Sequence, residues 1–422
     1  MGIKFRLTVM NFLQYAVWGS YLTSMGTQLV GIGMADKIGL FYAMQGIVSL
    51  FMPALVGIIA DRWVQAQRLL GICHLLAALF MAGAAFSISA SAPHYNYWLL
   101  FSLYSLSVAF YMPTIALSNS VAYSVLESNH MDTVKVFPPI RVWGTVGFIC
   151  AMLFCDFAGF QKNYMQFYQS AVLGVMLGLY AFSLPTCPTN TSGEQKSLVE
   201  ALGLRAFSLF KQKKMALFFI FSMLLGVSLQ ITNGFANPFI TSFREIPEFA
   251  STFGANHANA LISLSQVSET LCILLIPFCL KRFGIKNVML MAMFAWVLRF
   301  GLFGVGNPGG GVWMFILSMI VYGIAFDFFN ISGSLFVNNE TDTSIRSSAQ
   351  GLFMMMTNGV GATIGTLGAQ AIVNRFVYTE TTPIAQVAGW STSWLIFAGY
   401  ALVVALLFAV VFQYKHNPEA TR

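Results

Sequence analysis

The chain alternates long apolar stretches with short polar ones. Each apolar stretch has about twenty residues or more, which is the length a helix needs to cross the hydrocarbon core of a bilayer. Twelve such stretches can be delimited, at residues 7–33, 38–60, 69–89, 97–125, 139–158, 164–184, 214–240, 258–280, 287–306, 311–337, 347–374 and 388–414. They predict an all-α integral membrane protein with twelve transmembrane helices.

A polar segment at residues 185–213 divides these stretches into six and six. It contains Pro185 and Pro188 and ends in a basic amphipathic piece, so we expect a cytoplasmic linker between the halves 1–184 and 214–422. The halves share weak internal similarity, because charged pairs close the second and eighth stretches and an Ile-Arg pair opens the fifth and eleventh. Two related six-helix halves are typical of the major facilitator fold.

The composition supports membrane insertion. Of the 422 residues, 57% are hydrophobic and 9% are charged, against roughly 25% charged in soluble domains. A net charge of +7 is compatible with a nucleic-acid partner, but the basic residues are concentrated in particular loops. With both termini in the cytoplasm, 16 Lys and Arg residues fall on the cytoplasmic side and 4 on the opposite side. This bias predicts a multi-pass membrane protein with that orientation and no nucleic-acid partner.

The loop after the second stretch contains Gly57, Asp61 and Arg62. These residues resemble the major facilitator loop between helices two and three, although Val64 replaces its second glycine. The resemblance predicts a conformational latch formed by Asp61 and Arg62. The alternative interpretation is a solvated turn whose charges serve only the membrane orientation.

Functional residues are sought among polar side chains inside the apolar stretches, because a charge at the centre of a span costs at least about 2.5 kcal/mol without a partner. Arg141, Thr145 and Phe148 share one face of the fifth helix at positions i, i+4 and i+7. Pro138 and Pro139 favour a helix start just before Arg141. An interfacial arginine that snorkels towards water is the alternative.

Two further helices carry polar pairs at i and i+3. Gln230 and Asn233 lie on the seventh helix, and Gln266 and Glu269 lie on the eighth. Hydrogen bonds between helices are the alternative role for the amides, but Glu269 fits that role poorly. Arg299, on the ninth helix, is expected to snorkel or to form a structural pair.

The tenth helix combines aromatic side chains with an acid. Tyr322 and Phe326 lie at i and i+4, and Asp327 follows directly. A desolvated Asp or Glu has a raised proton affinity that a nearby arginine or a bound substrate lowers, so protonation and binding become linked. Flat aromatic faces suit a planar base, and the amides suit a polyhydroxylated ring. The residues predict a ligand that is part sugar and part aromatic.

The sequence closely resembles the nucleoside-proton symporter family over nearly the whole chain. Its most specific segments include Phe137-Pro-Pro-Ile-Arg141, Leu229-Gln-Ile-Thr-Asn233 and Phe326-Asp-Phe-Phe-Asn330. The resemblance implies import of purine and pyrimidine nucleosides, such as uridine and adenosine, with protons and with no metal or organic cofactor. It implies residence in a bacterial inner membrane, Asp327 in proton coupling, and a substrate site made of Arg141, Thr145, Phe148, Gln230, Asn233, Gln266, Glu269, Tyr322 and Phe326. Glu269 is also expected to take part in proton coupling, because it is a second carboxylate within an apolar span.

Several alternatives remain. A sugar-proton symporter would use similar amides and a glutamate, and a non-transporting receptor would bind nucleoside without accumulating it. An enzyme would need a nucleophile and base or a set of metal ligands, and neither pattern is present in the sequence. His74 is the only histidine within a span, and we expect it to be structural. A monomer is expected, because this fold transports as one unit.

Overall fold

The computed structural model describes residues 2–187, 204–342 and 345–414. Every regular element in these ranges is a helix. The contacts divide the chain into two compact units: Met1–Met34 with Ile47–Leu202, and Ala35–Gly46 with Gly203–Arg422. Most of the predicted linker lies outside the described residues, so its role stays a prediction.

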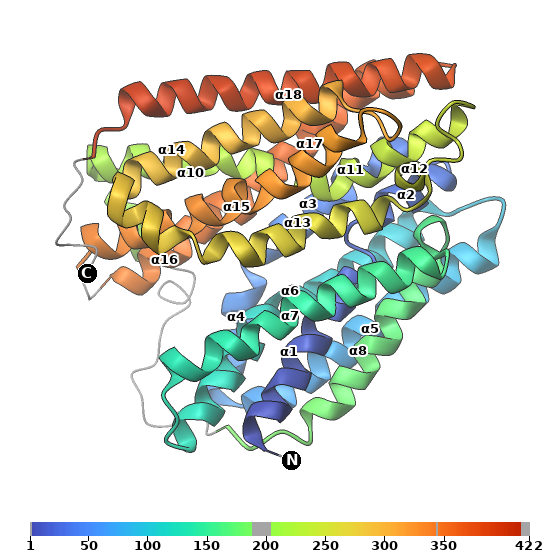
Figure 1. Ribbon diagram of the computed structural model, residues 1–422. Coiled ribbons are helices and arrows are strands. Elements are labelled where there is room, and N and C mark those ends of the chain that lie inside the picture. Colours follow the sequence, from blue (N-terminus) through green and yellow to red (C-terminus); the bar gives the residue numbers. More distant parts are fainter. Residues whose placement is uncertain (1, 188–203, 343–344, 415–422) are drawn as a thin grey trace. The chain divides into compact units, whose positions relative to one another are not determined.

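The first unit is a bundle of long helices (Figure 1). Its α-helices are α1 (Ile3–Gly19), α2 (Met25–Gly31), α4 (Met52–Arg62), α5 (Ala66–Ser91), α6 (Tyr97–Ser128), α7 (Thr133–Phe157) and α8 (Met165–Ala181). Helix α5 packs against α6 and α8, and α1 packs against α7 and α8.

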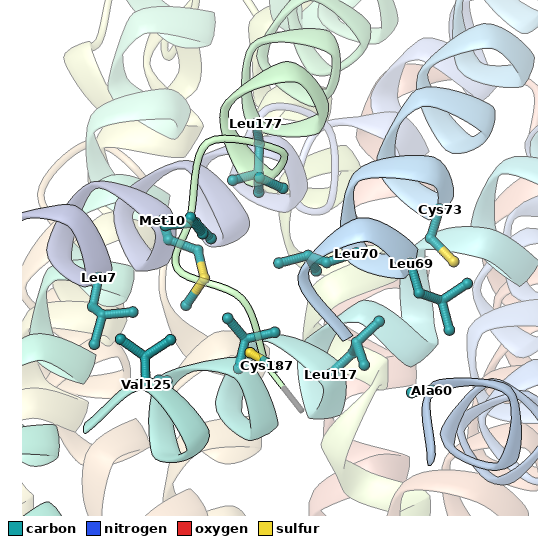
Figure 2. Close-up of a cluster of buried hydrophobic side chains, with 14 of the residues drawn as sticks. Leu7, Met10, Ala60, Leu69, Leu70, Cys73, Leu117, Val125, Leu177 and Cys187 are labelled. Atoms are coloured by element: carbon teal, nitrogen blue, oxygen red, sulfur yellow. The ribbon is translucent and has the colours of Figure 1, made fainter. Parts of the chain in front are cut away.

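Apolar side chains from several of these helices meet in one buried cluster. Figure 2 shows Leu7 and Met10 of α1 beside Leu70 of α5, Val125 of α6 and Leu177 of α8. All five are at most 1% exposed. Because lipid is as apolar as these side chains, close packing and dispersion stabilise the bundle more than removal from water does.

The second unit contains the remaining helices and the first part of α3. Its α-helices are α3 (Ile38–Ser49, up to Gly46), α10 (Lys213–Leu229), α11 (Ile231–Ser242), α12 (Phe253–Asn256), α13 (Ala258–Ile273), α14 (Ile276–Val305), α15 (Val312–Glu340), α16 (Arg346–Met354), α17 (Ala362–Val373) and α18 (Pro383–Val411). Helix α15 packs against both α13 and α14, and α14 packs against α18 (Figure 1).

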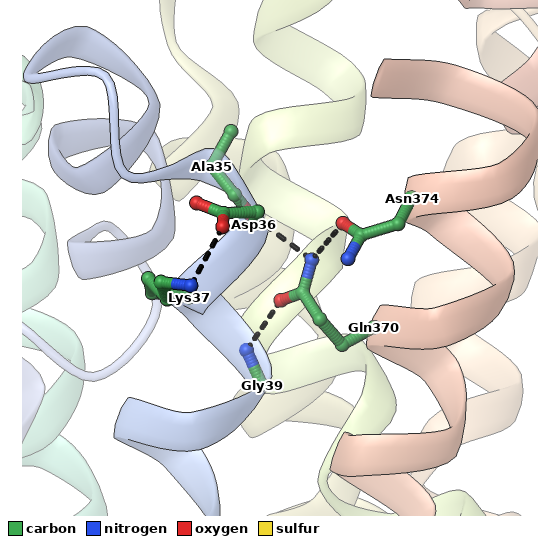
Figure 3. Close-up of polar contacts among 6 residues, drawn as sticks. All are labelled: Ala35, Asp36, Lys37, Gly39, Gln370 and Asn374. Carbon is green, nitrogen blue, oxygen red and sulfur yellow. Dashed lines mark hydrogen bonds and ion pairs between the residues drawn. The ribbon is translucent and has the colours of Figure 1, made fainter. Parts of the chain in front are cut away.

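The start of α3 is held by one side chain of α17. Gln370 accepts a hydrogen bond from the Gly39 backbone N–H at 2.6 Å and donates to the Ala35 carbonyl at 3.0 Å and to Asn374 at 2.7 Å (Figure 3). The N–H groups of a first helical turn have no partner within the helix. Gln370 therefore caps α3 and fastens it to the second unit.

Seven described helical segments are long and apolar enough to cross a membrane, and eight if the bent pair formed by Ala35–Ser49 and Met52–Ala60 counts as one span. The all-helical membrane architecture is confirmed, whereas the count of twelve stays a prediction. Several predicted stretches are broken. The first contains α1 and α2, the seventh contains α10 and α11, and the π-helical turn Met355–Gly361 divides the eleventh. Gly284 has φ 77° and interrupts α14 between the predicted stretches 258–280 and 287–306.

Helix α7 begins earlier than predicted. It starts at Thr133, so Pro138 and Pro139 lie inside it rather than before it. Asp132 accepts a hydrogen bond from the Lys135 backbone N–H at 3.3 Å and starts the helix. Each proline lacks the N–H that would donate to the carbonyl four residues earlier, and its ring crowds that carbonyl, so the pair weakens this part of α7 without ending the helix.

Candidate functional site

In the first unit, Arg141 is held over an aromatic ring. Its guanidinium carbon lies 4.0 Å from the ring centroid of Tyr15 on α1. Gly144 makes this arrangement possible, because a Cβ there would lie 2.6 Å from a ring carbon of Tyr15 and 2.9 Å from a guanidinium nitrogen of Arg141. A cation over an aromatic face is attracted by the ring quadrupole. The sequence analysis missed Tyr15, although a glycine one turn from an intramembrane arginine hinted at a close neighbour.

Phe148 and Thr145 lie on the same helix as Arg141. Phe148 is 6% exposed and meets the Trp18 ring edge-on, with centroids 6.2 Å apart. Thr145 is half-buried. Phe148 therefore packs against α1 in this structure, and its predicted contact with a base stays a prediction.

A buried polar network lies in the same unit. The Gln14 amide nitrogen donates to the Thr114 hydroxyl at 2.7 Å, and the Gln14 amide oxygen lies 2.7 Å from His74 Nε2. The Tyr111 hydroxyl donates to the backbone carbonyl of Gln14 at 2.7 Å. Because the amide oxygen can only accept, His74 Nε2 is the donor. His74 and Gln14 are fully buried and bonded, which supports the structural role expected for His74.

In the second unit, Gln230 and Asn233 bond to each other. The Asn233 amide nitrogen donates to the Gln230 amide oxygen at 2.8 Å. Gln230 stands at the junction between α10 and α11, and both side chains are half-buried. The two side chains predicted on one face therefore bond to each other, and their role in substrate binding stays a prediction. One oxygen on Asn233 and the donors on Gln230 are left for other partners.

The predicted residues of α13 and α15 come together because those helices approach closely. A Cβ at Gly323 would lie 2.6 Å from the Ser268 carbonyl oxygen, and the Ser268 hydroxyl donates to the Ile320 carbonyl. Tyr322, beside Gly323, interacts electrostatically with Glu269 and Asp327. Small residues at helix contacts are typical of membrane proteins. Gln266 and Glu269 are half-buried on α13.

The aromatic pair of α15 forms a stack. The Tyr322 and Phe326 rings have centroids 5.6 Å apart and an interplanar angle of 16°. Asp327 is 6% exposed, and its Oδ2 has no hydrogen-bond partner among the described residues. A buried carboxylate oxygen without a donor is costly when ionised, so it needs a proton, a cation or a ligand group as its partner.

Arg299 on α14 lies behind this stack. It is 2% exposed, and one of its terminal nitrogens donates to the Ser318 carbonyl at 2.7 Å. A guanidinium that is buried and bonded in this way does not snorkel, and among the described residues its hydrogen bonds go to a backbone carbonyl, a hydroxyl and a thioether rather than to an acid.

The structure thus divides the predicted site residues between the two units. The first unit holds Arg141, Thr145 and Phe148. The second unit holds the Gln230–Asn233 pair and, separately, the cluster of Glu269, Tyr322, Phe326 and Asp327, with Gln266 one turn from Glu269 on α13. Their convergence on one cavity stays a prediction. The side chains of Asp61 and Arg62 lie outside the described part of the structure, so the latch is also untested. Among the described residues, no group of three or more His, Cys, Asp or Glu residues is arranged to hold a metal.

Comparisons with known proteins agree over nearly the full length. The sequence model of the nucleoside H⁺ symporter family matches residues 1–417. The chain is 46% identical to the nucleoside permease NupG of Escherichia coli (strain K12) over 99% of this chain and 97% of the relative. It is 47% identical to the xanthosine permease of the same organism, over 99% and 98%.

Solved structures agree with these relatives. A crystal structure of the nucleoside transporter NupG has a TM-score of 0.88 at 46% identity, covering 98% of this chain and 100% of that one. The xylose transporter XylE from E. coli has a TM-score of 0.62 at 11% identity, covering 98% and 100%. This second likeness concerns the fold alone.

Proposed function

This chain belongs to the nucleoside H⁺ symporter family, and from that premise we propose that it imports nucleosides together with protons by alternating access. The chain is a multi-pass membrane protein. The proposal includes residence in a bacterial inner membrane as a monomer. Both termini are placed in the cytoplasm, because the distribution of basic residues favours that orientation.

The buried acid beside Tyr322 carries the proposal. Asp327 has a carboxylate oxygen without a hydrogen-bond donor among the described side chains, and Glu269 interacts with it electrostatically. Two interacting carboxylates can share one proton, and in the proposed cycle this pair carries the proton that moves with the substrate. A substrate that engages Glu269 changes this balance. Binding and protonation are then linked, as coupled transport requires.

The predicted ligand follows from the side chains around that acid. The Tyr322–Phe326 stack offers an aromatic face for a base. Glu269, Gln266 and the Gln230–Asn233 pair offer acceptors and donors for ribose hydroxyls. Purine and pyrimidine nucleosides, including uridine and adenosine, combine both parts. The names of the two E. coli relatives, a nucleoside permease and a xanthosine permease, support this class of substrate.

Uptake into proteoliposomes tests the function. We expect labelled uridine to accumulate above its external concentration under an inward proton gradient and to fall to equilibrium when a protonophore is added. Excess adenosine should compete, whereas excess xylose should not. Accumulation that follows sodium and ignores the protonophore would refute proton coupling. Competition by sugars alone would favour the sugar symporter, and binding without accumulation would favour the receptor.

A further inference from the structure

Arg299 is a buried cation that has no role in the proton-coupled transport proposed above. Its side chain is 2% exposed in α14. One terminal nitrogen donates to the Ser318 carbonyl at 2.7 Å and lies 3.4 Å from the Ser265 hydroxyl. Among the described residues, its Nε has no hydrogen-bond partner and no carboxylate lies within 4.0 Å of the guanidinium.

Such a charge is expensive if it serves packing alone. A buried guanidinium needs a paired acid or a full set of acceptors to repay its lost hydration, and Arg299 has neither. An apolar side chain of the same length would fill the space at a lower cost. The burial therefore points to an interaction that only a cation or a planar guanidinium supplies.

That interaction is with aromatic rings. The guanidinium carbon lies 4.6 Å from the Tyr322 centroid and 5.2 Å from the Phe303 centroid. Trp296, one helical turn before Arg299, meets Tyr322 edge-on with centroids 6.0 Å apart. Tyr322 in turn stacks on Phe326. Arg299 and Trp296 thus share one face of α14, against which the Tyr322 ring is held.

We propose that Arg299 is a positioning residue for nucleoside binding, whose guanidinium holds the Tyr322 ring and thereby orients the Tyr322–Phe326 stack for the base. This inference rests on the proposed function. Phe326 is half-buried and Tyr322 is 6% exposed, so Phe326 presents the more accessible ring and Tyr322 supports it. A ring that is fixed before binding loses less conformational freedom when the ligand arrives.

Three variants separate positioning from packing. Arg299→Met keeps the length without the charge, Arg299→Lys keeps the charge without the planar group, and Phe303→Leu removes the other ring that the guanidinium contacts. For each we would measure KM and Vmax of uridine uptake in proteoliposomes, equilibrium uridine binding and the thermal midpoint of the purified protein. Phe303 also packs against Trp394, with centroids 4.8 Å apart, so its replacement should lower the thermal midpoint.

We expect Arg299→Met to raise KM and the dissociation constant about tenfold with little change in Vmax, because it removes a desolvated cation–π contact. Arg299→Lys should recover part of the affinity, and Phe303→Leu should lose stability with an unchanged KM. In a Tyr322→Leu background, Arg299→Met should have little further effect on affinity.

A wild-type KM in Arg299→Met would overturn the inference, as would an equal KM rise in Phe303→Leu. If Arg299→Met fails to fold, the dissociation constant of Arg299→Lys decides. A wild-type value in the single variant, which keeps Tyr322, refutes a role for the planar group. Failure of the proposed function is distinguishable, because the wild-type protein would then show neither proton-driven uptake nor uridine binding.

Discussion

At the scale of single residues, the chemistry depends on ionisable side chains in an apolar setting. Asp327 and Glu269 interact beside Tyr322, and Arg299 lies behind the same ring. Each of these charges is costly in a membrane unless it has a partner, water or a ligand. The concentration of three such groups around one tyrosine identifies this part of α13, α14 and α15 as the place where substitutions should separate binding from coupling.

Asp327→Asn should separate those two steps. The amide has nearly the same shape as the acid but cannot release a proton, so we expect uridine binding to persist and concentrative uptake to disappear. Asp156→Asn is the matched control, because Asp156 is also buried in an apolar helix but accepts a hydrogen bond from Gln161 at 2.6 Å in the first unit. Uptake by Asp327→Asn with the pH dependence of the wild type would contradict the assignment of the proton to Asp327.

Glu269→Ala should reveal the contact with the sugar. Loss of a charged hydrogen bond costs about 1.5 to 3 kcal/mol, so affinity for uridine should fall at least about tenfold. Deoxyuridine should bind more weakly than uridine to the wild type and almost equally well to the variant. Phe326→Leu, which removes a ring but keeps its bulk, should cost only about 0.5 to 1.5 kcal/mol. If Glu269→Ala still discriminates fully against deoxyuridine, Glu269 does not contact the ribose and serves coupling alone.

At the scale of helices, the site depends on how closely α13 and α15 approach. Ser268 and Gly323 form the contact that brings Glu269 and Tyr322 together. In lipid, contacts of this kind replace the removal of apolar surface from water as the source of helix association. An added methyl group at the contact between α13 and α15 therefore lowers stability and also displaces Glu269 from Tyr322.

Gly323→Ala should force α13 and α15 apart. Its Cβ would lie 2.6 Å from the Ser268 carbonyl, which is backbone and cannot rotate away. Overpacking of this kind costs about 1 to 3 kcal/mol, so we expect a lower thermal midpoint and weaker uridine binding. Gly301→Ala in α14 is the control, because a Cβ there meets no atom within 4 Å. It should be neutral or stabilising by roughly 0.5 to 1 kcal/mol. Equal midpoints in the two variants would refute the close contact.

At the scale of the whole molecule, the relatives and the fold agree on a transporter. The family match spans residues 1–417, and the NupG crystal structure aligns along 98% of the chain. The seven long apolar segments fit a multi-pass membrane protein. Its orientation in that membrane is predicted only from the distribution of basic residues, of which 16 are placed on the cytoplasmic side and 4 on the opposite side.

Thiol labelling of whole cells tests this orientation. His94 and Lys135 are both exposed and are predicted on opposite sides of the membrane. We would replace the six native cysteines and introduce His94→Cys or Lys135→Cys. A membrane-impermeant reagent should label position 94 in intact cells and position 135 only after the membrane is opened. The reverse pattern would place both termini outside the cytoplasm.

The sequence by itself determined the class of protein, the family and the approximate position of each apolar stretch. These are properties of local composition and of long matching segments, so they can be read without knowing which helix faces which. The i and i+3 pairing of Gln230 with Asn233 and the i and i+4 stacking of Tyr322 with Phe326 are likewise local, because residues three or four positions apart are neighbours on a helical turn.

Only the tertiary structure decided the partners that come from different helices. It placed Tyr15 under Arg141, brought Ser268 against Gly323 and turned Arg299 inward towards Tyr322. It also attached residues 35–46 to the second unit through Gln370. In an apolar chain most faces of a helix look alike, so hydrophobic periodicity does not specify the rotation of each helix. Packing specifies it, because close approach is possible only where small residues meet and buried polar groups find partners.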